Sequence, residues 1–283
     1  MQTLVLGTAN FGENYGITNK SGLSDEEVEE ILNWSAGKIS ELDTSLDYKG
    51  SHSAISKYSA KFKITSKIDL HKVGSRLEIP TKVNRILGEL CIDKIERIML
   101  RPHSTDALFT LECIGELRKL VETGHVAEIG LSIYEPKELF YFASQLRAPF
   151  VFQVPLNLLN RSFQEVLMSN TEKYTHYKFY IRSIFLQGLL LTPLNELPSH
   201  LEEAVAPLSE LACELLKIGL PVLDATFSFV KAQSWATGVI VGINGLEQLK
   251  RNYKSFYKEG VIDFGFLNKL SRVPTRVIDP RQW

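Results

Sequence analysis

Short apolar runs alternate with longer amphipathic segments along a chain of 283 residues. Most of the apolar runs are rich in β-branched or aromatic residues, which is typical of buried strands. They predict eight strands, at residues 3–9, 40–45, 61–68, 96–102, 127–134, 149–159, 178–188 and 236–244. Helical patterns or helix-start signals separate most of these runs, so the two kinds of element alternate.

Local sequence signals predict where several helices begin. Ser24 precedes the run DEEVEEILNWSAGK, and Glu27 follows three positions later, which is the spacing of a capping box. Residues 106–124 form a clear amphipathic pattern, and Pro136 suits the first turn of another helix. The other predicted helices cover residues 51–58, residues 77–91 and a final segment from Gly245.

This alternation predicts an α/β fold. Strands that alternate with helices are joined by right-handed parallel crossovers. Eight such units in this length favour a closed (β/α)8 barrel, a TIM barrel in a single domain over residues 1–283, over an open doubly wound sheet. The glycines of LGTANFG, at positions 7 and 12, do not fit the G-x-G-x-x-G dinucleotide fingerprint. The sequence therefore favours the barrel.

Composition and charge exclude several classes of protein. With 44% hydrophobic residues and a net charge of −1, the chain can build a large core but has no basic surplus for nucleic acid. Cys91, Cys113 and Cys213 form neither a metal-binding nor a disulfide pattern. The start MQTLVLGTAN lacks the basic segment of a signal peptide, and no apolar run approaches the ~20 residues of a spanning helix. We expect a soluble cytoplasmic protein without a metal, a membrane or a nucleic-acid partner; its oligomeric state has no signature in the sequence.

In a barrel of this kind, the active site lies at the carboxyl ends of the strands. The residues that end or directly follow the apolar runs are therefore the candidates for chemistry. They are residues 43–48, Lys67, residues 101–103, Ser132, Tyr134, Gln153, Asn157, Arg182, Ser183 and residues 242–244.

The densest of these groups is the stretch ELDTSLDYKG, residues 41–50. A lysine such as Lys67 is costly to bury beside Asp43 unless the two form an ion pair, so we expect that pair. The lysine charge favours the phenolate of Tyr48, so we expect a lowered pKa that makes Tyr48 a general acid. The alternative is an ion pair that only stabilises the barrel rim, with Tyr48 packed beside it. We expect Asp47 to be a solvated loop residue.

Seven segments, in order over residues 3–256, together resemble the aldo-keto reductase superfamily. They are LGTANFG, DTSLDYKGSHSAI, ITSKI, GHVAEIGLSIYEPKEL, FQVPLNLLN, RSIFLQGLLL and GVIVGINGLEQLKRN. The segment RSIFLQGLLL is similar to a bacterial subgroup that is often associated with surface-polysaccharide sugar pathways. The resemblance implies an oxidoreductase that reduces a small aldehyde, ketone or keto-sugar to an alcohol with NAD(P)H.

The resemblance also implies roles for individual residues. Tyr48 matches the proton donor, Lys67 the lysine that tunes it, and Asp43 the partner of that lysine. Gln153 and Ser132 match the residues that hold the nicotinamide carboxamide. Further positions implied for the cofactor are Arg182, Ser183, Gly242, Asn244, Gln248 and Asn252, and Asn157 matches a residue that supports a loop. The start of the last helix is expected to present N–H groups to a phosphate.

Some positions depart from the family pattern at the catalytic end. Leu100 stands where the family has a histidine at the end of the fourth strand, and we expect His103, three residues later, to be an exposed loop residue. Ile133 replaces a family asparagine. Arg182 stands where many members stack an aromatic ring on the nicotinamide, and its charge suits an acidic substrate or a phosphate.

Other departures concern the choice of cofactor. Gly242 and Gln248 replace the lysine and arginine that read the 2′-phosphate, and Lys250 or Arg251 are the residues available to compensate. We therefore expect NADPH, with NADH as the alternative, and weak discrimination between them.

Two other functions stay open. A sensor that binds the cofactor with little or no turnover is favoured by Leu100, because leucine cannot orient a carbonyl. A Schiff-base lyase that uses Lys67 is the second alternative, but pairing with Asp43 disfavours it.

Overall fold

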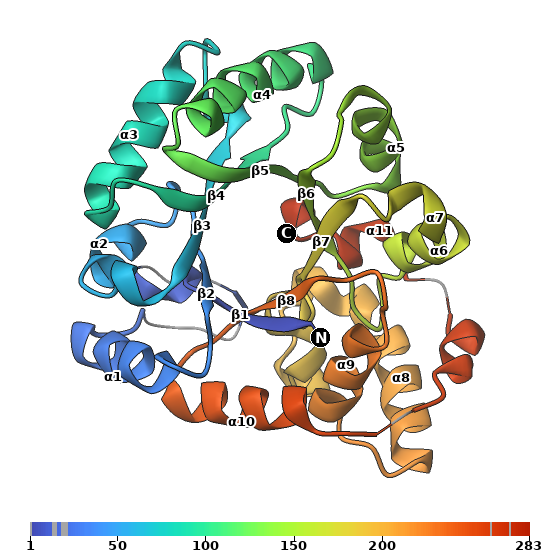
Figure 1. Ribbon diagram of the computed structural model, residues 1–283. Helices are drawn as coiled ribbons and strands as arrows, with labels where there is room; N and C mark the ends of the chain where they lie inside the picture. The colour runs from blue at the N-terminus through green and yellow to red at the C-terminus, as the bar shows by residue number, and fades with distance from the viewer. Residues whose placement is uncertain (1, 13–15, 18–21, 261, 272) are drawn as a thin grey trace.

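The computed structural model is a closed barrel of eight parallel strands in sequence order, which confirms the predicted (β/α)8 fold (Figure 1). The structure describes residues 2–12, 16–17, 22–260, 262–271 and 273–283. Strand β8 pairs with β1 and closes the barrel. The strands are β1 (Thr3–Gly7), β2 (Glu41–Asp43), β3 (Lys63–Asp69), β4 (Ile95–Arg101), β5 (Val126–Ser132), β6 (Phe150–Pro155), β7 (Tyr177–Arg182) and β8 (Gly238–Gly242).

The helices pack around the barrel, and all except the short α11, which lies closer to β7, form an outer ring (Figure 1). They are α1 (Asp25–Ser35), α2 (Ser51–Ser56), α3 (Glu78–Leu90), α4 (Ala107–Glu122), α5 (Pro136–Gln145), α6 (Ser162–Ser169), α7 (Thr171–Tyr174), α8 (Val205–Lys217), α9 (Val222–Lys231), α10 (Leu246–Tyr257) and α11 (Thr275–Ile278). Ser24 and Glu27 form the predicted capping box of α1, and Pro136 opens α5. Within the described ranges, no helix is both long and apolar enough to cross a membrane.

The seventh strand is shorter than predicted. It ends at Arg182, whereas the apolar run continues to residue 188. Ser183, Leu186 and Gln187 have φ angles of 58°, 49° and 54°, which a β-strand cannot contain. The chain therefore leaves the barrel after Arg182 and forms an irregular 3-10 segment, η4 (Leu186–Leu191).

Side chains alternate along each strand between the barrel interior and the surrounding helices. Five of them, from different strands, contact one another in the interior: Val5, Met99, Val151, Tyr180 and Ile240. The alternate positions of the strands join the main apolar cluster with the helices. Burial of both strand faces explains why the strands read as short apolar runs.

The same alternation determines which residues of β3 and β4 face the interior. Lys67 lies opposite Met99, and Asp69 lies opposite Arg101, in the parallel register. Because Met99 is an interior residue, Lys67, Asp69 and Arg101 share its side of the sheet. Leu100 belongs to the outer cluster and is fully buried there.

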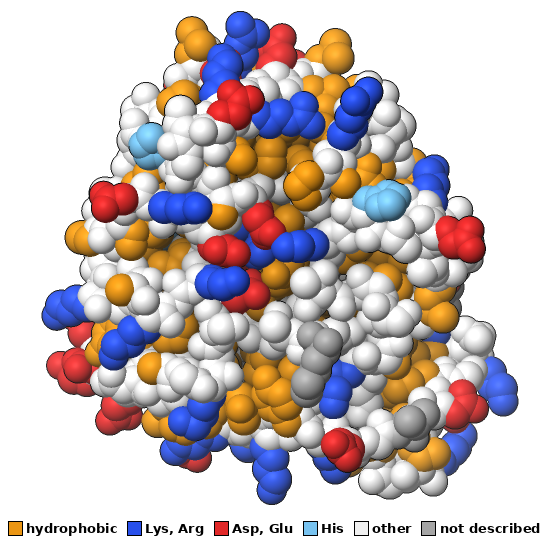
Figure 2. All heavy atoms as spheres, in the orientation of Figure 1, with side chains coloured by type: hydrophobic (Ala, Val, Ile, Leu, Met, Phe, Trp, Pro, Cys, Tyr) orange, Lys and Arg blue, Asp and Glu red, His pale blue; other side chains and the backbone are white. Residues whose placement is uncertain are grey.

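A buried ionic network fills the amino-terminal part of the barrel interior. Arg97 donates to Glu128 at 2.6 Å, to Thr65 at 2.9 Å and to the Tyr180 hydroxyl at 3.1 Å. Its Nη1 is 3.4 Å from Glu41. On the face shown in Figure 2, acidic and basic side chains are intermixed over the centre of the barrel. The barrel interior is therefore ionic at one end and apolar in its middle layer.

A buried histidine joins α2 to β3 and α3. His52 has Nε2 2.9 Å from Ser66 Oγ and Nδ1 2.7 Å from Glu89 Oε2. Burial lowers the pKa of His52, and the hydrogen bond and charge of Glu89 oppose this shift without cancelling it. The folded protein therefore resists protonation of this ring.

This lowered pKa predicts a loss of stability in mild acid. As the pH falls below 6.5, the unfolded chain binds a proton at this histidine before the folded chain does. The contribution of neutral His52 to the free energy of unfolding is complete above that pH. It is lost as the pH falls toward the pKa of His52 in the folded protein, with a slope of at most ~1.4 kcal/mol per pH unit. Urea unfolding of His52→Gln should show a flatter decline as the pH falls below 6.5. The exposed His176→Gln is the control, and an equally steep decline in His52→Gln would contradict the assignment.

Candidate active site

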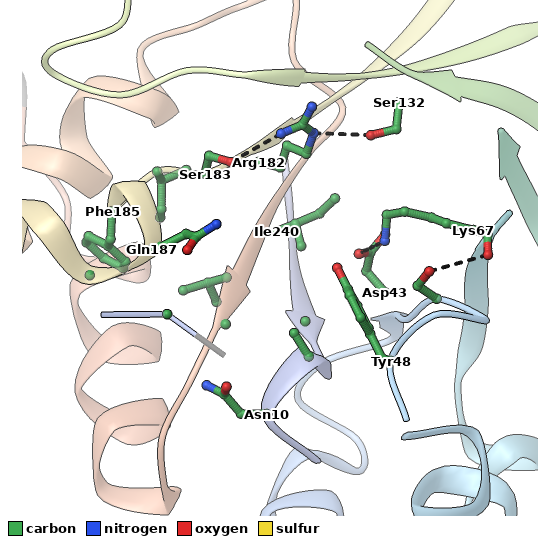
Figure 3. A pocket seen from close by; sticks show the side chains of 18 of the residues that line it. Asn10, Asp43, Tyr48, Lys67, Ser132, Arg182, Ser183, Phe185, Gln187 and Ile240 are labelled. Carbon is green, nitrogen blue, oxygen red and sulfur yellow. Dashed lines mark hydrogen bonds and ion pairs between the residues drawn. The ribbon is translucent and has the colours of Figure 1, made fainter. Parts of the chain in front are cut away.

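A cavity of about 300 Å³ opens at the carboxyl ends of the barrel strands (Figure 3). Gln153 lies beneath it against Asp43, and Asn252 lines an adjoining groove. The structure thus brings most of the predicted site residues to one place. Those in the cavity wall are Asp43, Tyr48, Lys67, Ser132, Arg182, Ser183, Gly242, Asn244 and Gln248.

The predicted ion pair between Asp43 and Lys67 is present. Lys67 Nζ contacts Asp43 Oδ1 and also donates to the Thr44 carbonyl at 2.9 Å. The second carboxylate oxygen, Asp43 Oδ2, accepts a hydrogen bond from Gln153 Nε2 at 2.6 Å. The pair forms because β2 and β3 are neighbours whose carboxyl ends meet at the same mouth.

Tyr48 lies beside this ion pair, with its hydroxyl directed toward Asp43 and Lys67 (Figure 3). Lys67 Nζ is 5.6 Å from the centroid of the Tyr48 ring. Burial raises the pKa of Tyr48 well above its usual value, the charges of Asp43 and Tyr134 raise it further, and the Arg182 charge opposes the shift.

The expected lowering of the Tyr48 pKa is therefore wrong for this structure. The positive charge of Lys67 alone would lower the pKa of Tyr48, but Asp43 neutralises that charge and itself favours the neutral phenol. Burial acts in the same direction, because it disfavours the charged phenolate. The phenol consequently keeps its proton at neutral pH.

Asp47 is closer to the site than predicted. It lines the cavity wall and is partly buried, although we expected a solvated loop residue. Its carboxylate forms an ion pair with Lys72 at 2.6 Å. That pairing holds the side chain in the wall.

The end of β4 presents an arginine to the cavity. Arg101 lines the wall and donates to Asp69 at 3.1 Å, whereas Leu100 packs outward among apolar side chains. His103, which we expected to be an exposed loop residue, is partly buried in the loop after β4, and its ring stacks on His71 with 4.8 Å between the centroids. Leu100 favoured the sensor alternative because a leucine facing the substrate could not orient its carbonyl. In the structure the Leu100 side chain lies outside the barrel interior, so it does not face the cavity.

Ser132 and Gln153 together present one hydrogen-bond donor and one acceptor. Arg182 Nε donates to Ser132 Oγ at 3.2 Å, which leaves the Ser132 hydroxyl hydrogen to donate (Figure 3). Gln153 Nε2 donates to Asp43, and Gln153 Oε1 is buried without a hydrogen-bond partner in the described part of the chain. A primary carboxamide needs such a pair, so these residues fit the nicotinamide of a dinucleotide.

A groove continues from the cavity along the start of α10 and shares Asn244 and Gln248 with it. Gln248 Oε1 accepts a hydrogen bond from the Asn244 N–H at 2.6 Å. Asn252 Nδ2 is buried there, and no described residue accepts a hydrogen bond from it. A Cβ built on Gly242 or Gly245 would meet nothing within 4 Å, so the backbone there is open to a ligand. The cavity and the groove together suit an elongated dinucleotide.

Several features of the site were not predicted from the sequence. Asn10 follows β1 and donates to the Ile243 carbonyl at 2.9 Å, and its Oδ1 is buried without a partner among the described residues. Asp69 lines the cavity beside Arg101, and Phe185, Gln187 and Gly188 of the loop after β7 also line it. Asp69 could have been identified from the sequence, because it lies two residues after Lys67 in the same strand and so faces the same side of the sheet. No signal marked the loop, because its apolar residues resemble a strand.

Asn157 has the supporting position implied by the resemblance. It is fully buried, donates to the Ser183 carbonyl at 3.1 Å and accepts from the N–H groups of Leu159 and Asn160. It therefore ties the turn after β6 to the turn after β7. In the parts of the chain that the structure describes, no group of three or more His, Cys, Asp or Glu is placed to hold a metal ion.

Comparisons with known proteins agree with this geometry. The family model described as Aldo/keto reductase family matches residues 3–263. The holo form of aldo-keto reductase AKR11C1 from Bacillus halodurans is 18% identical, with a TM-score of 0.75 over 98% of this chain and 95% of that one. Glycerol dehydrogenase AKR11B4 from Gluconobacter oxydans is 20% identical, with a TM-score of 0.72 over 98% and 93%. No curated protein matches the sequence. At these identities the solved structures support the fold alone.

Proposed function

This chain belongs to the aldo/keto reductase family, and we propose that it reduces the carbonyl of a small aldehyde, ketone or keto-sugar to an alcohol with NAD(P)H. Membership implies an oxidoreductase. The observation that carries the proposal is the Tyr48 hydroxyl directed toward the Asp43–Lys67 ion pair in a cavity that continues into a long groove.

Tyr48 is the proposed proton donor. Bound NAD(P)H supplies a hydride to the carbonyl carbon. Tyr48 holds a proton for the carbonyl oxygen, and its raised pKa keeps that proton in place at neutral pH. The proposed role of Lys67, whose Nζ is 5.6 Å from the centre of the Tyr48 ring, is to offset the repulsion between Asp43 and the negative charge that develops on the phenol oxygen during transfer.

The proposed cofactor site extends from the cavity into the groove. Ser132 and Gln153 hold the nicotinamide carboxamide through the donor and acceptor that they leave open. Arg182 fixes Ser132 beside the nicotinamide. The remaining proposed contacts, to the phosphates and the adenosine, come from Ser183, Gly242, Asn244, Gln248 and Asn252.

A screen of carbonyl compounds tests the proposal. Aldehydes, ketoses and nucleotide-linked keto-sugars would be offered with NADPH and with NADH, and oxidation of the cofactor followed at 1:1 stoichiometry with alcohol. Absence of binding to both dinucleotides would refute the proposal. A change in nicotinamide fluorescence without turnover of any carbonyl would favour the sensor alternative, and borohydride trapping of substrate on Lys67 would favour the lyase.

A separate prediction concerns the choice of cofactor. Arg251 lines the groove, whereas Lys250 is paired with Glu247 at 2.6 Å. Arg251 is exposed, so its ion pair with a 2′-phosphate should contribute ~1 kcal/mol or less, a preference for NADPH of about fivefold at most. Titration should show that Arg251→Gln removes the preference and that Lys250→Gln keeps it. Equal loss in both variants would contradict the assignment to Arg251.

A further inference from the structure

Three acidic and three basic side chains line the cavity, but they do not form three ion pairs with one another. Each acidic side chain in the wall already has a basic partner, and the pairs are Asp43–Lys67, Asp47–Lys72 and Asp69–Arg101. Arg182 also lines the wall and has no carboxylate within 4.0 Å in the described parts of the chain. Because Asp47 pairs with Lys72, which does not line the cavity, Arg182 is left as a lining cation without an ion pair among the described residues.

Among the described residues, the groups that accept hydrogen bonds from Arg182 are all neutral. Its guanidinium donates to Ser132 Oγ at 3.2 Å, to Ser183 Oγ at 3.3 Å and to the Ile133 carbonyl at 2.8 Å. These contacts use three of the five N–H donors of an arginine and neutralise none of its charge. A partly buried cation without a counter-ion is unfavourable, so the cavity is suited to a ligand that supplies one.

A second guanidinium converges on the same place. The Cζ atoms of Arg182 and Arg101 lie 4.1 Å and 5.5 Å from the centroid of the Tyr134 ring. Arg101 is anchored through one N–H to Asp69, and Asp69 is itself held by the His71 backbone N–H at 3.0 Å and by His71 Nδ1 at 2.9 Å. This anchoring fixes the position of Arg101 and leaves its other N–H groups for a ligand.

We propose that the substrate carries an anionic group, a carboxylate or a phosphate, near its carbonyl, and that Arg182 and Arg101 bind this group beside Tyr134. The inference rests on the proposed function and specifies its substrate class. The forked guanidinium donors match the paired oxygens of both groups. The carbonyl then lies toward Tyr48, and the anionic group is unchanged in the alcohol product.

Matched pairs of substrates that differ in charge test this inference. The first pair is 4-carboxybenzaldehyde and 4-carbamoylbenzaldehyde, which have nearly the same shape. The second is glyceraldehyde 3-phosphate and glyceraldehyde, and it separates a phosphate site from a carboxylate site. With NADPH, the wild-type protein should have a kcat/KM about tenfold or more higher for the anionic member of at least one pair.

Three variants assign the effect to residues. Arg101→Gln should reduce that preference about tenfold, a change equivalent to ~1.4 kcal/mol, and Arg101→Lys should restore part of it. Arg281→Gln is the matched control, because its Cζ is 4.0 Å from the same ring while its guanidinium is paired with Asp279 at 2.7 Å and 2.8 Å. It should leave the preference unchanged.

A binding measurement separates this inference from the proposed function. The alcohols 4-(hydroxymethyl)benzoate and 4-(hydroxymethyl)benzamide do not react with NADPH, so calorimetric titration of the NADPH-loaded protein measures binding alone. Tighter binding of the benzoate that Arg101→Gln abolishes, without turnover of any aldehyde, would support the anion site and refute the reductase. Turnover of neutral and anionic aldehydes at equal kcat/KM, with equal binding of the two alcohols, would overturn the anion site and leave the reductase standing.

Discussion

We expect Tyr48→Phe to lower the rate of carbonyl reduction about 10²- to 10⁴-fold while the dissociation constant for NADPH stays the same. Phenylalanine keeps the ring that lies 5.6 Å from Lys67 Nζ and removes only the hydroxyl. A neutral carbonyl that accepts hydride then has no donor for its oxygen. The rate should be measured in a single turnover, because release of product can limit kcat and hide the chemical step.

Two observations would contradict this prediction. One is an unchanged single-turnover rate, which would assign the proton to another group and leave Tyr48 as a packing residue at the rim. The other is a loss of cofactor affinity, which would mean that the hydroxyl organises the site. Tyr58→Phe is the control, because Tyr58 lies outside the cavity, between α2 and η2 (Ser59–Lys61), and its loss should change neither quantity.

The second large effect concerns stability. We expect Arg97→Met to lower the free energy of unfolding by about 3–5 kcal/mol, the usual cost of removing one partner from a buried ion pair. Methionine retains the apolar stem, but Glu41 is buried and loses its basic partner, whereas Glu128 keeps Lys178. Urea unfolding at pH 7 should show this loss.

We attribute the size of this loss to the buried Glu41 carboxylate, which has no basic partner in the variant, and a second substitution tests this. The double variant Arg97→Met/Glu41→Gln should recover part of the loss, because an amide costs less to bury than a carboxylate. The exposed pair of Lys217 with Glu214 gives the control: Lys217→Met should cost less than ~1 kcal/mol. A loss below that value for Arg97→Met would show that water or relaxation compensates Glu41.

Much of the fold was predictable because a barrel needs a simple pattern. Strands buried on both faces read as apolar runs, and eight of them separated by helices leave few topologies. The Asp43–Lys67 pair was predictable for the same reason, since parallel neighbours bring their carboxyl ends to one mouth. Both conclusions depend on the periodicity of apolar residues and on the order of the strands and helices, and both can be read from the sequence.

The parts that failed depend on direction and on neighbours far away in the chain. The run after Arg182 is apolar whether it continues as a strand or turns with positive φ, so composition could not separate the two. Leu100 and Arg101 are adjacent in β4, so their side chains face opposite sides of the sheet. A shift of one residue in the strand register would exchange which of them faces the barrel interior. The sign of the Tyr48 pKa shift required the burial of the ring and the neutralisation of Lys67, and neither is a local property of the sequence.

The bond between Gln153 and Asp43 has a consequence for molecular recognition. A carboxylate can only accept hydrogen bonds, so the amide nitrogen of Gln153 must face Asp43 and the carbonyl oxygen must face away from it. Asp43 thus fixes the polarity of the buried Oε1 atom, as well as holding Lys67. A ring substituent with an N–H group, such as a carboxamide, can donate a hydrogen bond to Gln153 Oε1. The corresponding carboxylate has no hydrogen to donate, so its oxygen would repel Oε1. Asp43 therefore has two effects: it makes Gln153 favour an amide over an acid, and it holds Lys67 beside the proposed proton donor Tyr48.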